Sequence, residues 1–533
     1  MNNKTQTLDV LVVGAGVAGL YLVHRLRQLG LTVKAVDRAS DVGGTWYWNR
    51  YPGARCDVDS MFYSYGFDED LEQEWTWTER YAAQPEILAY LSHVAYRFDL
   101  RKDILFNTSI SAASYDEENR SWHLTTGDGE MLQASFCVMA TGCLSATNKP
   151  VFPGQNTFQG AIYHTGDWPH EGVDFAGQRV GVIGTGSSGV QAIPEIALEA
   201  EHLTVFQRTA NYVVPAQNRP LEEDEIAAVK SKYQELRAFA RTTPGGFNFA
   251  PGDKSALEVT EQERATEYEK RWQIGGIPFM GAFNDLALNE EANQTAQDFV
   301  REKIRDILTD PPLAEMLCPD TVIGCKRLSL GTGYFETFNR ANVSLVDVSS
   351  ASIDRITKDG LAVDGKEYAL DSLVFATGFD AMTGALSRIN ISGRHGIKLK
   401  DEWAAGPRTF LGLAMAGFPN LFIVTGPGSP SVLSNMLPTI EQHVEWISDC
   451  IAHLRDKGFA SIEAERSVQN DWVDHVNDLA AKTLRYTCNS WYLGANVPGK
   501  PRVFMPYIGG MPAYRDKCDQ VAANGYEGFD LSP

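Results

Sequence analysis

Two glycine-rich loops of the same pattern limit the folds open to this chain more than any other feature. They read Gly14-Ala-Gly16-Val-Ala-Gly19 and Gly184-Thr-Gly186-Ser-Ser-Gly189. Each follows a short, mostly apolar run, at residues 8–13 and 179–183, and each precedes a stretch with helical spacing of apolar side chains. A strand, a tight glycine turn and a helix in this order form half of a Rossmann unit, whose loop holds a pyrophosphate. Two such units predict two dinucleotide sites, and therefore two cofactors that exchange electrons.

The strands that close the two units differ in the residues that follow them. The first strand, 32–36, is followed by Asp37, about twenty residues after the loop, where an acid accepts hydrogen bonds from a ribose. The second strand, 203–207, is followed by Arg208 and Thr209. An acid there would repel a 2′-phosphate, whereas arginine can pair with it, so the second site favours NADPH over NADH. The candidate residues of this second site are Gly184, Thr185, Gly186, Ser187, Ser188, Gly189, Arg208 and Thr209.

The chain has 533 residues, too many for one hydrophobic core. Residues 136–142 and 373–378 form a matching pair, because each is an apolar run that leads into Ala-Thr-Gly. Such strands close the nucleotide domains of flavoproteins with two dinucleotide sites, and this resemblance places boundaries near Ser145 and Phe379. We therefore expect an α/β fold with a discontinuous FAD domain, 1–145 and 380–533, and an NADP domain, 146–379. Charged stretches with helical spacing at 222–241 and 292–308 predict a helical insertion in the NADP domain, over about 220–320.

Composition excludes several classes of protein. The formal net charge is -21 and the pI is near 5.0, so no basic surface is expected to bind nucleic acid. None of the eight cysteines forms a Cys-x-x-Cys pair, and no histidine cluster has metal-ligand spacing, so we expect no metal site and a reducing compartment. The sequence carries no recognisable signal peptide and no bilayer-spanning run, which favours a cytoplasmic protein without a membrane partner.

The segment between the loops is the most specific feature of the chain. Its pattern is Phe158-x-Gly160-x-x-x-His164-Thr165-x-x-Trp168-Pro169, which resembles the fingerprint of type I Baeyer–Villiger monooxygenases. Enzymes of this family convert ketones to esters or lactones with FAD, NADPH and dioxygen, through a C4a-peroxyflavin. The resemblance covers nearly the whole chain and implies the same cofactors and a small-molecule ketone substrate here. It also places His164 in the linker between the domains, where it couples NADP binding to domain position.

A second segment, from Gly43 to Asp57, resembles the longer fingerprint of the same family, which ends in an aspartate. In the family this acid lies behind the flavin and hydrogen-bonds the catalytic arginine. Asp59 is the rival carboxylate, and we expect it to be a surface or capping residue. Arg327 matches the catalytic arginine, a role that suits a guanidinium because it stays protonated while donating to a developing oxyanion.

Further positions follow from the same resemblance. Residues 427–436 are more like phenylacetone and steroid monooxygenases than cyclohexanone monooxygenases, which suggests a bulky or aryl ketone. For Trp491 on the family's mobile loop, packing is an equal alternative to NADP contact. Expected FAD contacts, besides the first loop and Asp57, are Thr45, Trp46, Trp48, Tyr63, Ile110 and Met436. Expected NADP contacts, besides the second loop, are Arg55, Lys326, Arg327 and Trp491, and the expected ketone pocket is Ser431, Val432 and Leu433.

Three other functions fit parts of the pattern. A flavin-containing or N-hydroxylating monooxygenase would act on sulfur or nitrogen, but its fingerprint is shorter and lacks the His-Thr-x-x-Trp-Pro ending. A flavin-bearing binding protein without turnover is a second alternative. It would not consume NADPH in the presence of a ketone, whereas a monooxygenase would. A disulfide reductase is disfavoured by the lack of paired cysteines. We expect a monomer or a weak homo-oligomer.

Overall fold

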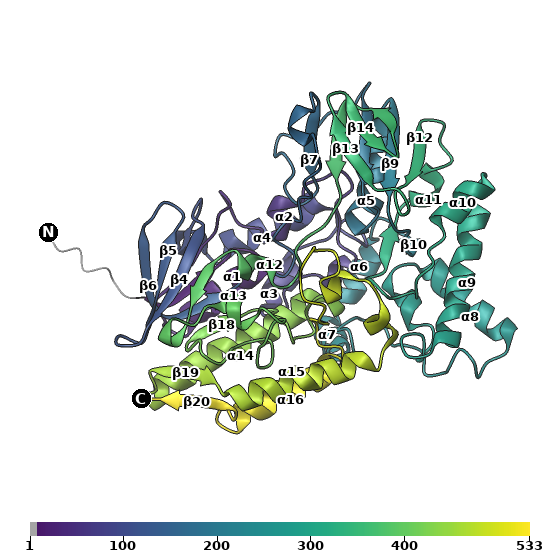
Figure 1. The fold of residues 1–533 in the computed structure, drawn as a ribbon. Helices are drawn as coiled ribbons and strands as arrows, with labels where there is room; N and C mark the ends of the chain where they lie inside the picture. The colour runs from purple at the N-terminus through teal and green to yellow at the C-terminus, as the bar shows by residue number, and fades with distance from the viewer. Residues whose placement is uncertain (1–7) are drawn as a thin grey trace.

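The computed structural model describes residues 8–533, which form two lobes (Figure 1). Each lobe is built around a sheet that contains the strand preceding one of the glycine loops. The first lobe contains an eight-stranded sheet with the order β17-β4-β5-β6-β1-β2-β3, and β18 pairs with β6. The central strands are parallel and almost fully buried, as their runs of valine and leucine predict. Its strands are β1 (Leu8–Val13), β2 (Val33–Val36), β3 (Ile104–Leu105), β4 (Ile110–Asp116), β5 (Ser121–Thr126), β6 (Met131–Met139), β17 (Asn390–Ser392) and β18 (Leu421–Ile423).

The second lobe repeats the arrangement with five parallel strands in the order β12-β9-β8-β16-β7. These strands are β7 (Ala161–His164), β8 (Arg179–Ile183), β9 (His202–Gln207), β12 (Val343–Asp347) and β16 (Ser372–Phe375). An antiparallel sheet of β13 (Ile353–Thr357), β14 (Gly360–Val363) and β15 (Lys366–Ala369) belongs to the same lobe, and β10 (Val213–Pro215) pairs with β11 (Ser329–Gly331). The expected α/β class with two Rossmann-like units is confirmed.

Helices after each loop lie where the sequence predicts them. In the first lobe α1 (Val17–Gln28) follows the loop and packs on α14 (Met436–Lys457) from the last third of the chain, so this lobe draws on both ends of the sequence. In the second lobe α5 (Ser187–Glu199) follows the loop. The limits near residues 145 and 379 stay a prediction.

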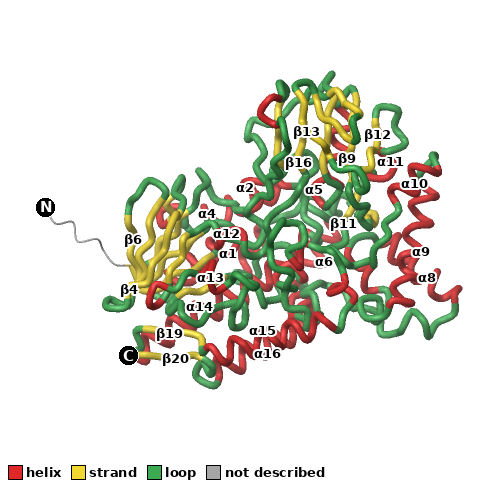
Figure 2. Tube along the Cα trace, in the orientation of Figure 1, coloured by secondary structure: helices red, strands yellow, loops and turns green. Residues whose placement is uncertain are grey.

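The helices between residues 220 and 320 divide between the two lobes. The segment contains α6 (Glu223–Lys230), α7 (Tyr233–Thr242), α8 (Glu261–Ile274), α9 (Glu290–Ile307) and α10 (Pro311–Leu317). Helices α8 to α10 pack against the second lobe through residues such as Trp272, Val300 and Leu317, and lie at its outer side (Figure 2). Helix α7 instead buries Tyr233 in the core of the first lobe, beside Phe62. The insertion therefore contacts both lobes, which its charged sequence did not indicate.

The first lobe is completed by further helices and by the C-terminal region. The helices are α4 (Gln84–Arg97) and the short α2 (Thr45–Trp48), α3 (Glu69–Glu74), α12 (Gly384–Ser387) and α13 (Leu399–Glu402). The 3-10 turns include η1 (Ser60–Phe62), η6 (Ser431–Leu433), η7 (Leu484–Thr487) and η8 (Trp491–Leu493). The short helix α11 (Tyr334–Thr337) belongs to the second lobe. The C-terminal region adds α15 (Arg466–Ala481), α16 (Met511–Ala523), β19 (Ser461–Ala464) and β20 (Phe529–Ser532). Over residues 8–533 there is no helix whose length and apolar character suit a membrane span.

Candidate active site

Both glycine loops are held against their sheets by the same two backbone contacts. A Cβ atom on Gly14 would lie 2.4 Å from the carbonyl oxygen of Ala140, and one on Gly19 would lie 1.9 Å from that of Gly14. The same contacts recur in the second loop at 2.5 and 2.3 Å, with Ala376 in the place of Ala140. No side chain fits at these distances, so only glycine allows the loop to approach the Ala-Thr-Gly strand end. In each lobe the glycine loop therefore contacts the Ala-Thr-Gly motif.

The middle glycines differ in what lies above them. A Cβ atom on Gly16 would lie 3.2 Å from the Cα of Gly44, whereas no atom lies within 4 Å of the same point on Gly186. The first loop is therefore covered by the 43–57 segment, and the second is open. Asp37 accepts hydrogen bonds from the backbone N–H groups of Ala15 (2.6 Å) and Ala39 (2.8 Å), so this carboxylate also shapes its loop.

The predicted flavin contacts lie in several parts of the first lobe. Trp46 donates from Nε1 to the Tyr63 hydroxyl at 3.2 Å, and the Trp48 ring lies under the guanidinium of Arg38, 4.2 Å from its centroid. Thr45 begins the short helix that carries both tryptophans. Ile110 is buried in the same cluster as the end of β2. Met436 begins α14 and packs between two apolar clusters.

Arg327 and Asp57, 270 residues apart, form a bidentate ion pair. The guanidinium donates from Nε to one carboxylate oxygen and from Nη2 to the other at 2.9 Å, while Nη1 donates to the carbonyl oxygen of Val432 at 2.8 Å. The side chains are 20% and 27% exposed. Burial alone would lower the pKa of Arg327, but the charge and hydrogen bonds of Asp57 raise it above its usual range. Two of its five N–H groups remain free for a ligand.

Asp59 has the capping role expected of it. It directly precedes η1 as its N-cap residue, and its side chain accepts from the N–H of Met61 at 3.3 Å. Burial raises its pKa to about 6, although the charge of Arg80 opposes the shift. Asp59 forms no part of the Arg327 pair, so two carboxylates on one loop have separate roles.

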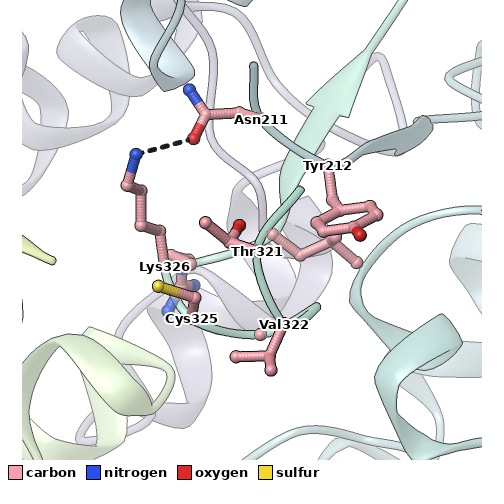
Figure 3. A pocket seen from close by; sticks show the side chains of 9 residues that line it. Asn211, Tyr212, Thr321, Val322, Cys325 and Lys326 are labelled. Carbon is pink, nitrogen blue, oxygen red and sulfur yellow. Dashed lines mark hydrogen bonds between the residues drawn. The ribbon is translucent and has the colours of Figure 1, made fainter. Parts of the chain in front are cut away.

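Lys326 lines a small hollow together with Asn211 and Cys325 (Figure 3). Its Nζ donates to Oδ1 of Asn211 at 3.1 Å. Burial lowers the pKa of Lys326, and the positive charge of Arg208 lowers it further. Arg208 itself is exposed at the end of β9. Two cations face the same region, which suits a phosphate group.

The fingerprint segment 158–169 joins the linkers between the lobes. His164, at the end of β7, is buried; its Nδ1 accepts from the N–H of Gly166 at 3.0 Å. Its Nε2 lies 3.3 Å from the carbonyl oxygen of Asn148 and 3.2 Å from the Thr377 hydroxyl, so Nε2 carries the proton and donates to the carbonyl. Burial lowers the pKa of His164, and the neutral ring therefore links both crossing segments.

The other fingerprint residues pack within the second lobe. A Cβ atom on Gly160 would lie 2.1 Å from the carbonyl oxygen of Asp371, and the ring of Phe158 packs on the same lobe. Thr165 is fully buried, and Trp168 lies in the core of the second lobe, where the stretch ends at Pro169.

Other predicted NADP contacts lie where the first lobe meets α5. The Arg55 side chain donates to Glu79 and to the carbonyl oxygen of Tyr81, each at 2.8 Å. The Gln191 amide on α5 accepts from the Tyr51 hydroxyl (2.7 Å) and donates to the carbonyl oxygen of Arg55 (3.1 Å). In the open loop Ser187 lies 3.2 Å from Ser329, Ser188 lies beside Tyr51, and Thr185 donates to the carbonyl oxygen of Thr209 at 3.1 Å.

The predicted pocket residues form part of an apolar cluster beside Arg327. Ser431 has φ +42°, and its hydroxyl faces the sulfur of Met382 at 3.7 Å. Val432 and Leu433 pack with segments from elsewhere in the chain, and the rings of Trp491 and Tyr492 lie 4.2 Å apart. Sequence reasoning missed Met382 and Tyr492. The position next to Trp491 was the one available signal for Tyr492, and Met382 had none.

Comparison with known proteins agrees with this geometry. Residues 7–221 match the flavin-binding monooxygenase-like family. An acetone monooxygenase (methyl acetate-forming) of Gordonia sp. (strain TY-5) is 45% identical, over 99% of this chain and 100% of its own length. Phenazine N-monooxygenase PhzNO1 of Lysobacter antibioticus is 44% identical, over 99% and 98%. The solved structure of an oxidized steroid monooxygenase bound to NADP superposes with a TM-score of 0.95 at 53% identity, over 99% and 100%. The likeness spans the whole chain, including both fingerprint segments, and the chain belongs to the type I Baeyer–Villiger monooxygenases.

Proposed function

We propose that this protein uses FAD, NADPH and dioxygen to convert ketones to esters or lactones. The observation that carries the proposal is the Arg327–Asp57 pair beside the apolar cluster that contains Val432. The pair brings a permanent cation with free N–H groups to a partly enclosed, apolar place. An oxygen insertion next to a carbonyl requires such a group, because negative charge develops on the carbonyl oxygen.

The chain fits both cofactors. The close backbone contacts of the first loop, with Asp37 beside it, suit the pyrophosphate and ribose of FAD, and Trp46, Trp48, Tyr63, Ile110 and Met436 would line its path. The open loop from Gly184 to Gly189 suits NADP, and Arg208 and Lys326 would pair with the 2′-phosphate. We further propose that the FAD domain comprises 1–145 and 380–533 and the NADP domain 146–379, and that the protein is a monomer or a weak homo-oligomer.

Bound reduced flavin supplies activated dioxygen, and the protein controls what surrounds it. Arg327 remains protonated throughout, because Asp57 stabilises its charge in a partly buried setting. Its free Nη1 and Nη2 hydrogens donate to the oxyanion that forms on the ketone. Asp57 holds the guanidinium plane in one orientation by its two contacts, and the Val432 carbonyl fixes the third side. Asp57 is thus a positioning residue for Arg327.

The substrate class follows from the wall beside Arg327. Ser431, Val432 and Leu433 would line the ketone pocket, with Trp491 at its edge. The apolar surroundings favour a bulky or aryl ketone, and the 53% identity to a steroid monooxygenase agrees with this choice. The 44% identity to a phenazine N-monooxygenase makes nitrogen oxidation the second candidate activity.

The test is incubation of the holoenzyme with NADPH, ¹⁸O-labelled dioxygen and a panel of aryl ketones, steroid ketones, sulfides and aromatic N-heterocycles. We expect esters that carry one labelled oxygen, with the best yield from a bulky ketone. Labelled N-oxide or sulfoxide without ester from any ketone would contradict the proposal and favour heteroatom oxygenation. A full ester yield from Arg327→Ala would contradict the assigned role of Arg327.

A further inference from the structure

Helix α5 contacts both of the segments that supply the candidate active-site ion pair. On one side it contacts the fingerprint segment that ends at Asp57, and on another it contacts strand β11, which begins two residues after Arg327. The helix itself begins at the open glycine loop, where NADP is proposed to bind. The loop, the Asp57 segment and the Arg327 segment therefore share one support.

The contact with the Asp57 segment centres on one residue of α5, Gln191. Its Oε1 accepts from the Tyr51 hydroxyl at 2.7 Å and from the N–H of Arg55 at 3.4 Å, and its Nε2 donates to the carbonyl oxygen of Arg55 at 3.1 Å. A Cβ atom on Gly53, whose φ is +77°, would lie 2.3 Å from the Gln191 carbonyl oxygen. Only glycine lets the turn approach the helix so closely, so Gln191 holds residues 51–55 through its backbone and its side chain.

These hydrogen bonds lie where the chain crosses from one lobe to the other. Ala54 is buried in the hydrophobic core of the second lobe, whereas Cys56, two residues later, is buried in that of the first. On the first-lobe side the backbone is hydrogen-bonded to residues 82–84. On the second-lobe side it is hydrogen-bonded to Gln191. Asp57 directly follows this crossing, so its position depends on both sets of contacts.

The segment that carries Arg327 is supported by the same helix. The hydroxyl of Ser329 on β11 lies 3.2 Å from that of Ser187 in the first turn of α5. A Cβ atom on Gly331 would lie 3.8 Å from the side chain of Val190, the neighbour of Gln191. Helix α5 therefore sets the distance between the two segments, in addition to the ion pair itself.

We propose that Gln191 is a positioning residue for the Arg327–Asp57 pair and makes the orientation of the pair depend on helix α5. The inference rests on the proposed function, in which free N–H groups of Arg327 donate to the oxyanion that forms on the ketone. Without the Gln191 amide, residues 51–55 lose three hydrogen bonds, and the backbone before Asp57 is free to shift on α5. A shifted carboxylate turns the guanidinium away from the oxyanion.

The first variant is Gln191→Met in the full-length holoenzyme, which removes the amide but keeps the length of the side chain. Ester formation per folded molecule should fall about tenfold, because small displacements of catalytic groups lower rates by up to about 10². In the Asp57→Asn background the same substitution should change the rate by less than about twofold, since Gln191 acts through Asp57. A residue that only stabilises the fold would not show this coupling.

Hydrogen exchange tests the hold on the segment without any turnover. In holoenzyme with FAD and NADP+, the backbone N–H groups of residues 51–55 should exchange faster in Gln191→Met than in the unaltered protein, because Arg55 loses its acceptor. Tyr51→Phe removes one hydrogen bond to Gln191 and keeps the buried ring. It should show the same two effects at smaller size, about two- to threefold in ester formation, and it supplies the test if Gln191→Met fails to fold.

Gln178→Met is the matched control. Gln178 is also half-buried in the second lobe, where it accepts from the Ser372 hydroxyl at 2.6 Å and donates to the carbonyl oxygen of Asp174 at 2.7 Å. This variant should match the unaltered protein in ester formation and in the exchange of residues 51–55.

Three results would contradict parts of this account. Equal exchange of residues 51–55 in Gln191→Met and in the unaltered protein would overturn the proposal. Additive effects of Gln191→Met and Asp57→Asn on ester formation would also overturn it, because Gln191 would then act by another route. If the unaltered protein forms no ester from any ketone, the proposed function fails, and the exchange comparison still decides whether Gln191 holds the Asp57 segment.

Discussion

Two arginine–carboxylate pairs join the middle of the chain to the first lobe, and they differ in what each guanidinium leaves free. Arg327 donates three hydrogen bonds, two to Asp57 and one to the carbonyl oxygen of Val432. Arg237, on α7, donates four: one to Glu72 of α3, two to Ser64 and one to the carbonyl oxygen of Tyr65.

The two pairs also differ in their exposure to solvent. The Arg327 and Asp57 side chains are 20% and 27% exposed, against 9% and 1% for Arg237 and Glu72. The nearly saturated, buried pair holds two segments together, because Arg237 has one N–H group left to offer a ligand. An open pair is available for chemistry. Four predictions test this difference.

The largest effect is expected from Arg327→Ala. Removal of one oxyanion donor alone costs ~10²–10³ in rate, and Arg327 also supplies the only charge assigned to the oxyanion, so ester formation should fall by about 10³ or more. Bound FAD, read from its absorbance, should stay near full occupancy. Arg327→Lys keeps the charge but loses the bidentate contact, and its rate should lie between those of the unaltered protein and Arg327→Ala. Loss of flavin or of folding in Arg327→Ala would show that the open pair is structural as well.

The second prediction concerns the closed pair. Arg237→Met leaves the carboxylate of Glu72 buried without its partner, which should destabilise the protein by about 3–5 kcal/mol in urea unfolding. Ester formation per folded molecule should stay close to normal. The double variant Arg237→Met, Glu72→Gln should recover much of the loss. Arg355→Met, which breaks an exposed pair with Glu367 (3.4 Å), is the control and should cost less than about 1 kcal/mol.

The third prediction separates position from charge in the open pair. Asp57→Asn keeps the size of the side chain but loses one charge-assisted contact, so Arg327 should remain charged yet less well oriented. We expect ester formation to fall by about 10–100-fold, comparable to losing a charged hydrogen bond of ~1.5–3 kcal/mol. Asp59→Asn, two residues away, should leave the rate unchanged. Equal effects of the two substitutions would contradict the assignment of Asp57.

The smallest expected effect is a pH dependence of the free energy of unfolding, which arises near the closed Arg237–Glu72 pair. Glu441, on α14, accepts from the N–H of Gly66 at 2.6 Å and is 5% exposed. Burial raises its pKa to about 7, although the charge of Arg237 opposes the shift. The folded state therefore holds a proton that the unfolded state has lost, and stability falls as pH rises through this range. Between pH 6 and pH 7 the loss should be about 1 kcal/mol.

The pH prediction is checked by urea unfolding of Glu441→Gln and of the unaltered protein at both pH values. The variant should lack this part of the pH dependence, so the difference between the two proteins should grow by the same amount. Identical slopes for both proteins would show that Glu441 does not titrate in this window. Ester formation should have the same pH profile in the variant as in the unaltered protein, because Glu441 lies near the closed Arg237–Glu72 pair.

Much of the fold could be predicted because its signals are local. A glycine loop, the strand before it and the helix after it lie within about thirty residues, and each is recognisable from backbone requirements alone. The repeated Ala-Thr-Gly motif was visible as a pair of strands, and the structure adds that Ala140 and Ala376 contact the loops. The helices of the insertion were also predicted, but the docking of α7 on the first lobe was not. A buried Arg237 looks in sequence like any other charge on a solvated helix.

The sequence by itself determined the two Rossmann units, the two fingerprint segments and, through them, the family. These features depend on neighbouring residues, on turns that only glycine permits and on periodic burial. Only the tertiary structure decided which distant side chains meet: Asp57 with Arg327, and Arg237 with Glu72. Such contacts are set by how whole elements pack. No local pattern distinguishes an open ion pair from a closed one, because the difference lies in how many donors the surrounding backbone has already taken.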